Sequence, residues 1–191
     1  MKRAVVTIEG VSPLLMNPMN EETLMGILTG TSVKVPRDLT PVQICERKLY
    51  KGENGELGIP AVNLFSSLAE AGRKVKNGKT QISTATSTTL PSFLEIEELF
   101  LPFSAEAGWV PDLRRGVSNS GANKVAVAIV RPRFDLWELK ITIGIDDTVV
   151  DESVVRELFR IAGTSVGLCD FRPAKKGQFG RFTVSDWKSL D

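Results

Sequence analysis

A chain of 191 residues, of which 42% are hydrophobic and 25% are charged, has the composition of a globular protein with room for one core. Its 24 lysines and arginines balance 23 aspartates and glutamates, so the molecule as a whole carries no field that attracts a polyanion. It contains no histidine, which excludes Ser-His-Asp and Cys-His nucleophile systems and every metal site that uses imidazole.

The cysteines and the apolar segments bear on where the protein works. Cys45 and Cys169 are far apart in the sequence, so they predict neither a zinc ribbon nor a disulfide framework. No apolar run approaches the length of a membrane span, and residues 1–3 lead directly into a strand rather than a signal sequence. These features predict a cytoplasmic protein with no membrane partner.

The first half of the chain predicts one strand and two helices, separated by irregular segments. Residues 2–9 alternate apolar and polar side chains, as in a strand that is buried on at least one side. Residues 21–38 are weakly patterned and predict a mobile excursion from the core. Thr40-Pro41 then begins a helix that stops near residue 50. Residues 61–75 carry apolar side chains on one helical face, with small residues that permit close packing.

The second half predicts three strands and a helix. Residues 92–103 predict a strand, whereas residues 105–123 show no period and predict a long polar loop. Residues 124–133 and 136–145 predict two further strands, the second with the clearest alternation in the chain. A helix over residues 151–163 follows, because apolar side chains recur there at helical spacing.

A basic, glycine-spaced segment connects this helix to a last predicted strand over residues 180–186. Its glycines let the backbone approach another backbone or a ligand closely: Gly167, Gly177 and Gly180. Four cations accompany them: Arg172, Lys175, Lys176 and Arg181. Such a loop can present amides and positive charge to a phosphate. It can equally be a tight β connection whose cations are only solvated, and the residues alone favour neither interpretation.

Without the irregular segments, the order of elements is β-α-β-β-α-β, which predicts a ferredoxin-like α+β fold. Both helices are then expected on one face of a four-stranded antiparallel sheet. The second-ranked alternative is another α+β sandwich that uses residues 92–103 as a core strand. The chain is expected to be a single domain over 1–191, with its core and insertions divided as follows: core 1–9, 59–76 and 124–187, insertions 10–58 and 77–123.

Three segments of the chain match the pattern of one family: Val6-Thr7-Ile8-Glu9-Gly10-Val11-Ser12-Pro13-Leu14-Leu15, Ile59-Pro60-Ala61, and Gly167 through Arg181. They resemble the first strand with its turn, the entry to the first helix, and the C-terminal glycine-rich loop of the RAMP superfamily. These are the RNA-binding proteins that build CRISPR effector complexes. The Gly-Ile-Pro-Ala, Arg-Pro-Arg-Phe and Phe-Gly-Arg-Phe segments also resemble uncharacterised bacteriophage proteins. The resemblance omits most of residues 18–40 and 77–123, so it implies a minimal, bacteriophage-type member.

The resemblance implies binding of nucleic acid rather than cleavage. Backbone-type members bind single-stranded RNA along the open sheet face and polymerise side by side on it. Processing-type members cleave RNA, commonly with a histidine, which this sequence lacks. The implied setting is the cytoplasm of a bacterial or phage-infected cell, and the implied partners are single-stranded RNA or DNA and further copies or subunits of a ribonucleoprotein assembly.

The first hypothesis is therefore a non-catalytic protein that binds single-stranded nucleic acid. Phosphate neutralisation is assigned to these cations: Arg114, Arg115, Arg131, Arg133, Arg172, Lys175, Lys176 and Arg181. Trp109, in its polar loop, is the preferred residue for stacking on a base, whereas Phe134 and Phe171 are expected to pack in the core.

Two alternatives are of different classes. One is an assembly or interaction module without nucleic acid, in which residues 10–58 and 105–123 contact neighbouring copies. The other is an enzyme that holds Mg²⁺ on Asp146, Asp147, Asp151 and Glu152. An acidic turn and helix N-terminus explain those carboxylates more simply. No catalytic residue, metal or cofactor is predicted.

Overall fold

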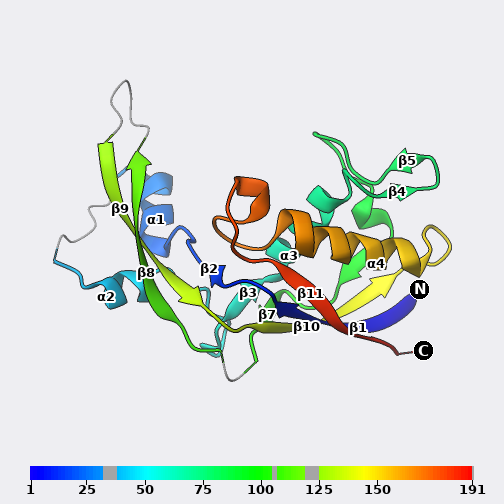
Figure 1. The fold of residues 1–191 in the computed structure, drawn as a ribbon, viewed down its shortest axis with the longest axis horizontal. Helices are drawn as coiled ribbons and strands as arrows, with labels where there is room; N and C mark the ends of the chain where they lie inside the picture. Colours follow the sequence, from blue (N-terminus) through cyan, green and yellow to red (C-terminus); the bar gives the residue numbers. More distant parts are fainter. Residues whose placement is uncertain (32–37, 105–106, 119–124, 191) are drawn as a thin grey trace.

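The computed structural model describes residues 1–31, 38–104, 107–118 and 125–190 (Figure 1). Its main sheet consists of four strands: β1 (Lys2–Gly10), β6 (Leu94–Ile96), β10 (Glu138–Ile145) and β11 (Phe182–Ser189). They are antiparallel and lie in the order β11-β1-β10-β6. Two helices, α3 (Ala61–Ala71) and α4 (Glu152–Ile161), lie together on one face of this sheet (Figure 1). The protein is thus a mixed α/β structure built on antiparallel strands.

The core fills the space between this sheet and the two helices. Along β1, Ala4, Val6 and Ile8 are buried and the residues between them are less so, which confirms the alternation predicted for this strand. Leu64 of α3 and Leu158 of α4 belong to the same cluster of buried residues. Every second residue of β10 completes it: Leu139, Ile141, Ile143 and Ile145.

A second sheet lies beside the first. It is formed by β2 (Leu14–Leu15), β8 (Val110–Ser118) and β9 (Val125–Phe134), in the order β2-β9-β8. β8 pairs with β9 over its whole length, from Val110 opposite Arg133 to Ser118 opposite Val125. They form a long hairpin, called the β8–β9 hairpin below. Residues 119–124, which belonged to the predicted loop and the start of the next predicted strand, lie outside the described residues.

Two predictions for this region are wrong. Residues 124–133 were expected in the main sheet, but their described part pairs with β8, and β6 occupies the position beside β10. Part of the predicted polar loop over 105–123 is the strand β8. The side chains of β8 are mostly exposed, so the strand needs no alternation of apolar residues and leaves no period in the sequence. Its backbone pairing with β9 determines its conformation.

Shorter elements fill the other connections. They are α1 (Glu21–Thr29), α2 (Pro41–Glu46), β3 (Gly58–Pro60), β4 (Lys76–Asn77), β5 (Thr80–Gln81) and β7 (Phe100–Pro102), with 3-10 turns at Leu90–Ser92 and Pro173–Lys175 and a π-helical turn at Ala162–Val166. A helix begins after Thr40, as predicted, although it ends at Glu46 rather than near residue 50. The predicted excursion over 21–38 contains α1, which starts where the Asn20 side chain accepts a hydrogen bond from the amide of Thr23 at 2.9 Å. Residues 32–37 of this predicted excursion lie outside the described part of the chain.

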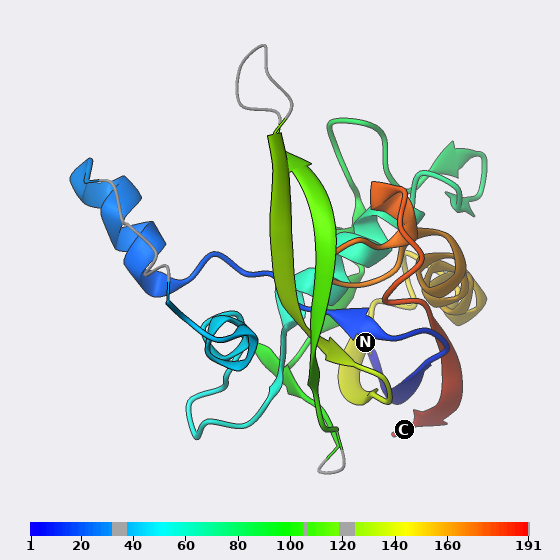
Figure 2. The ribbon, with the colours of Figure 1, turned by 60° about the vertical axis from the view of Figure 1, so that its left-hand side comes forward.

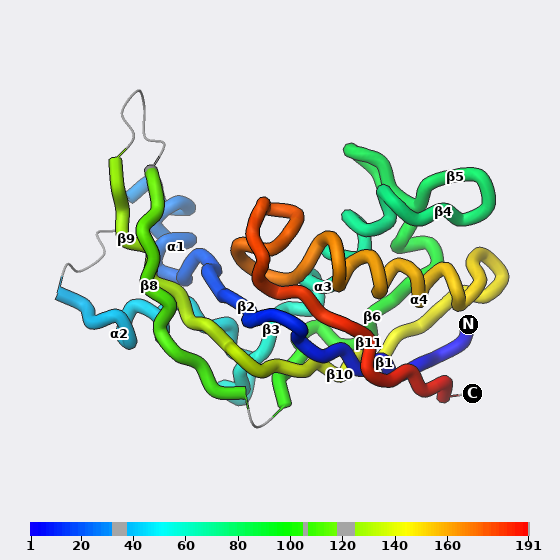
Figure 3. The backbone as a smooth tube through the Cα atoms, viewed as in Figure 1, coloured from blue at the N-terminus to red at the C-terminus, as the bar shows by residue number. Residues whose placement is uncertain are grey.

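The arrangement in space separates the β8–β9 hairpin from the main sheet. Figure 2 shows the hairpin as a long ribbon with α1 and α2 on one side and the main sheet with its helices on the other. The two chain ends lie close together at the end of the molecule away from the hairpin (Figure 3). No helix within the described residues is long and apolar enough to cross a membrane.

Candidate nucleic-acid interface

The glycine-rich loop, residues 167–181, folds back on itself so closely that its glycines are required. Gly167 and Gly180 have φ angles of 77° and 67°, in the left-handed region that side chains disfavour. A Cβ atom on Gly180 would lie 2.1 Å from the carbonyl oxygen of Leu168, and one on Gly177 would lie 1.7 Å from that of Phe171. The glycines therefore serve close approach of one backbone segment to another, which is the second of the two interpretations left open by the sequence.

Backbone hydrogen bonds fix this loop to the turn that follows β1. The amide of Gly180 donates to the carbonyl of Pro13 at 2.8 Å, and the amide of Asp170 donates to that of Leu15 at 2.9 Å. From α3, the buried hydroxyl of Ser67 donates to the carbonyl of Gly167 at 2.9 Å. Two segments far apart in the sequence, the turn after β1 and helix α3, hold the loop, so its exposed side chains project from a fixed backbone.

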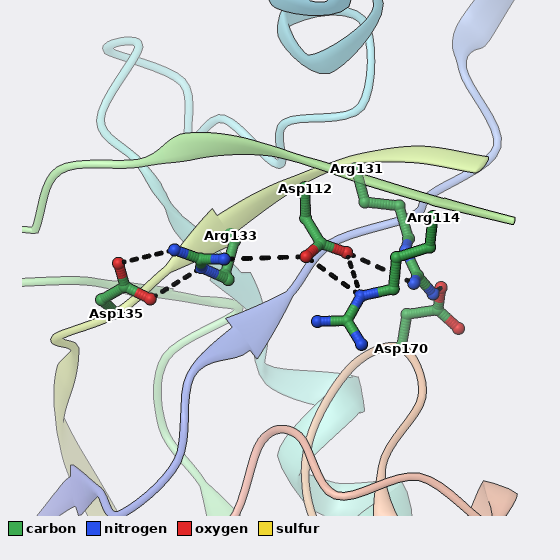
Figure 4. A network of polar contacts seen from close by, with 6 residues as sticks. All are labelled: Asp112, Arg114, Arg131, Arg133, Asp135 and Asp170. Atoms are coloured by element: carbon green, nitrogen blue, oxygen red, sulfur yellow. Dashed lines mark hydrogen bonds and ion pairs between the residues drawn. The ribbon is translucent and has the colours of Figure 1, made fainter. Parts of the chain in front are cut away.

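A network of ion pairs joins the loop to the β8–β9 hairpin (Figure 4). Its centre is the carboxylate of Asp112, a residue that is only 5% exposed. The oxygens of this carboxylate lie 2.8 Å from Nε of Arg114, 3.6 Å from Nη2 of Arg131 and 3.7 Å from Nη1 of Arg133. Two further carboxylates complete the network: Asp170 at 2.8 Å from Arg131, and Asp135 at 2.7 Å from Arg133. Three arginines face three aspartates, so the formal charge of the network is zero.

This network corrects the role predicted for Arg131. Its side chain is buried and paired with two carboxylates, so it cannot offer its charge to a phosphate in this structure. Arg114 and Arg133 keep part of their guanidinium groups exposed but are also paired. Asp135 further raises the pKa of Arg133, which stabilises its charge. The arginine-rich sequence of β8 and β9 mainly neutralises carboxylates within the protein.

The other predicted cations differ in how free they are. Arg115, Lys175 and Lys176 are exposed and form no ion pair within the described part of the chain. Arg181 is exposed and donates to the carbonyl of Thr164 at 3.0 Å. Arg172 is half-buried; it donates to the carbonyl of Cys169 at 2.9 Å and lies 3.8 Å from the carboxylate of Glu70.

Of the three aromatic residues considered, Phe134 lies as predicted, whereas Phe171 and Trp109 do not. Phe134 is fully buried, as expected, but Phe171 is 38% exposed. The Phe171 ring stacks on that of Phe179 with centroids 6.0 Å apart, and the guanidinium of Arg114 lies 4.7 Å from the Phe179 centroid. The predicted stacking residue, Trp109, is half-buried against the core instead. In the sequence, Phe171 lies among turn-forming residues and outside any run of regularly spaced apolar residues. That position was the feature that could have indicated its exposure.

A polar cavity beside the loop was missed by the sequence analysis. It has a volume of about 300 Å³ and is lined by Asn17, Tyr50, Asn63, Ser66, Cys169, Asp170 and Arg172. Burial raises the pKa of the Tyr50 phenol, against the opposing effect of the Asn63 amide. Burial also raises the pKa of the Cys169 thiol to about 12. These residues come from four separate parts of the sequence, so no local motif signals the cavity.

The acidic residues near the end of β10 have structural contacts. Asp146 accepts hydrogen bonds from the hydroxyl and amide of Thr148 at 2.7 and 3.0 Å, and these lower the pKa of its carboxyl group. Asp147 lies 3.7 Å from the N-terminal amine and 3.6 Å from Nζ of Lys2. Among the described residues, no group of three His, Cys, Asp or Glu side chains is arranged to hold a metal ion.

Comparison with known proteins gives distant similarity to solved structures alone. No model of a known protein family matches the sequence, and no curated protein matches it. A solved structure described as the cryo-EM structure of the type III-B Cmr-beta bound to cognate target RNA contains a chain that is similar, with 12% identity and a TM-score of 0.48. The match covers 98% of this chain and 61% of that chain, so this protein spans less than two thirds of its length. A likeness at this level assigns neither a family nor a function.

Proposed function

We propose that this protein binds single-stranded nucleic acid, RNA or DNA, without catalysis, on a surface formed by the glycine-rich loop and the base of the β8–β9 hairpin. The observation that carries the proposal is the half-exposed ring of Phe171, which is held against Phe179 while Arg114 covers the other ring. A ring fixed in this way loses little entropy when a base stacks on it. Such stacking contributes about 1–3 kcal/mol per base.

Free positive charge lies next to this ring. The backbone of Gly177 packs directly on that of Phe171, which brings the preceding Lys175 and Lys176 close to it. Arg115 is also exposed, but successive side chains of a strand point to opposite faces, so it lies on the face of β8 away from the one on which Arg114 contacts Phe179. Because the larger arginine network is neutral in itself, only a few cations remain for phosphates. The proposal therefore implies modest affinity that depends only weakly on salt. The logarithm of the binding constant should fall by roughly 0.7 per phosphate contact for each tenfold rise in salt concentration on a single strand.

The proposal includes a finer description of the fold. With β6 as the second strand, the core order β1-α3-β6-β10-α4-β11 corresponds to a ferredoxin-like arrangement, on which α1, α2 and the β8–β9 hairpin are insertions in one domain. A RAMP-like protein that binds a strand and assembles side by side along it is consistent with this order. The absence of histidine supports binding without cleavage of RNA.

The test is binding of labelled oligouridine and oligothymidine, followed by fluorescence anisotropy at increasing salt. Replacing Lys175 and Lys176 together by glutamate is expected to weaken binding of all sequences alike and to reduce the salt slope by about 1.4. The matched control, Lys76→Glu with Lys79→Glu, makes the same charge change in and beside the β4–β5 hairpin, away from the β8–β9 hairpin (Figure 1). Absent or salt-independent binding by the unaltered protein rejects the proposal.

One observation favours the second candidate, an assembly module without nucleic acid. The helix α1 exposes four large apolar side chains, each between 51% and 78%: Leu24, Met25, Ile27 and Leu28. Contiguous exposed apolar surface of this kind marks contact sites for other proteins. Light scattering before and after nuclease treatment separates the two candidates. Assembly that survives nuclease and is lost in Leu24→Glu with Leu28→Glu supports the module alone.

A further inference from the structure

The polar cavity lies between α3 and the glycine-rich loop. Asn63 and Ser66 of α3 form one wall, and Cys169, Asp170 and Arg172 of the loop form another. Its volume of about 300 Å³ is at the lower end of the range for ligand pockets, about 300–1,000 Å³, and suits a single flat ring system. Unlike most such pockets, it is lined mainly by groups that form hydrogen bonds.

Several of these groups are not used by the protein itself. The side chains of Asn17 and Ser66 form no hydrogen bond within the described residues. The amide nitrogen of Asn63 lies 3.9 Å from the sulfur of Cys169, which is a weak interaction, and its amide also forms a hydrogen bond with Tyr50. The side chains of Asn17 and Ser66 are both exposed, so water satisfies them in the free protein, and a ligand in the cavity can take the place of that water. The cavity is therefore equipped to hold a polar molecule.

The charges around the cavity favour a neutral ligand. The carboxylate of Asp170 and the guanidinium of Arg172 both line it, and their formal charges cancel. Asp170 is held in place because one oxygen accepts from Arg131 at 2.8 Å and the other accepts from the amide of Phe171 at 2.9 Å. Each carboxylate oxygen retains a further lone pair. A phosphate would meet this carboxylate at close range, whereas an uncharged group with adjacent donors would not be repelled.

We infer that this cavity takes one unstacked guanine base of a bound strand. Guanine carries two adjacent donors, N1–H and N2–H₂, which suit the Asp170 carboxylate, and two acceptors, O6 and N7, which suit the guanidinium of Arg172. The other three bases lack that pair of adjacent donors. Phe171 lies between these two residues in the chain, although its ring does not line the cavity, so we infer that the base that stacks on the ring and the base that enters the cavity are neighbours in one strand. Single-stranded recognition commonly combines stacking with hydrogen bonds to base edges.

This inference rests on the proposed function, and the experiment separates the two. Oligouridines of equal length, with one central guanosine, adenosine or cytidine, are compared in the same anisotropy assay with the unaltered strand. The strand with one guanosine is expected to bind roughly tenfold more tightly than the others. Equal binding of all four strands overturns the inference and leaves the proposed function intact, whereas binding of none overturns the proposed function.

Variants assign the preference to the cavity. Asn17 and Ser66 also line the cavity, where they are placed to form hydrogen bonds with the remaining edge of the base. Asn17→Ala with Ser66→Ala removes two exposed side chains that have no partner within the described residues, so the fold is expected to survive, and the loss of these two hydrogen bonds lowers the preference for guanosine at least about threefold. Asn54→Ala, which changes an exposed asparagine outside the cavity, leaves the preference unchanged. Equal loss in both variants overturns the assignment. Saturable binding of guanosine monophosphate alone, with no preference within strands, shows that the cavity serves a free nucleotide and also overturns it.

Discussion

Nη1 of Arg131 lies 2.8 Å from Oδ2 of Asp170, and this ion pair joins the β8–β9 hairpin to the glycine-rich loop across 39 positions of sequence (Figure 4). The same guanidinium lies 3.6 Å from the buried carboxylate of Asp112. It also lies 5.8 Å from the centroid of the Phe171 ring. One arginine thus positions the hairpin, the loop and the proposed stacking residue relative to one another.

Replacing Arg131 by methionine is expected to lower the free energy of unfolding by about 3 kcal/mol. The change leaves Asp170 without its partner, while Asp112 keeps two other arginines, so the loss should lie at the lower end for a broken buried pair. Urea denaturation followed by tryptophan fluorescence measures it. Arg115→Met, on the same hairpin but without an ion pair among the described residues, should change the value by less than about 0.5 kcal/mol. Similar losses in both variants would contradict a structural role for Arg131.

Phe171→Ala is expected to weaken binding of single strands by about 1–3 kcal/mol, because a base loses its stacking surface. The slope of affinity against salt should stay the same, since no charge is removed. Phe171→Trp, which keeps an aromatic face, should bind as well as the unaltered protein. Anisotropy titrations at several salt concentrations provide both quantities, and a changed slope in the alanine variant would count against stacking as the cause.

Gly180→Ala and Gly55→Ala form a matched pair, because both glycines are in the left-handed region, at φ 67° and 81°. A Cβ atom on Gly55 meets open space, so that variant should lose only the conformational cost of about 1–2 kcal/mol. At Gly180 the Cβ atom would also strike the carbonyl of Leu168, whose amide donates to Gly180. Its loss of stability in urea denaturation should be clearly larger. Equal losses would show that the loop can open at little cost.

The stability of the protein should fall as the pH rises above about 9, and Cys169 should account for part of the fall. Its pKa is about 12 in the folded protein and near 9 when exposed, so between these values the unfolded chain releases a proton that the folded chain keeps. The raised pKa values of Cys45 and Tyr50 act in the same direction, and the lowered pKa of Lys48 acts in the opposite one.

Comparison of the unaltered protein with Cys169→Ala isolates the contribution of this thiol. The difference between their melting temperatures should be constant up to about pH 8 and should shift in favour of the alanine variant at higher pH. A difference that stays constant up to pH 11 would mean that the thiol ionises as easily in the folded protein as in the unfolded chain.

The sequence alone determined the elements whose side chains are sorted by the core. β1, α3, β10, α4 and β11 were predicted near their observed positions, because an element with one buried face repeats its apolar residues at its own period. The glycines of the loop were also identified from sequence, since only glycine tolerates backbone contacts as close as those of Gly177 and Gly180.

Only the tertiary structure decided how β6, β8 and β9 pair, and which charges remain free. Strand partners are chosen by backbone hydrogen bonds, which leave no mark on an exposed side chain such as Leu113. Likewise, the sequence shows that Arg131 is a cation but not that two carboxylates surround it. Charge neutralisation and the polar cavity both depend on residues that are distant along the chain and meet only when the second sheet packs against the loop. Contacts of that kind are properties of the folded molecule rather than of any segment.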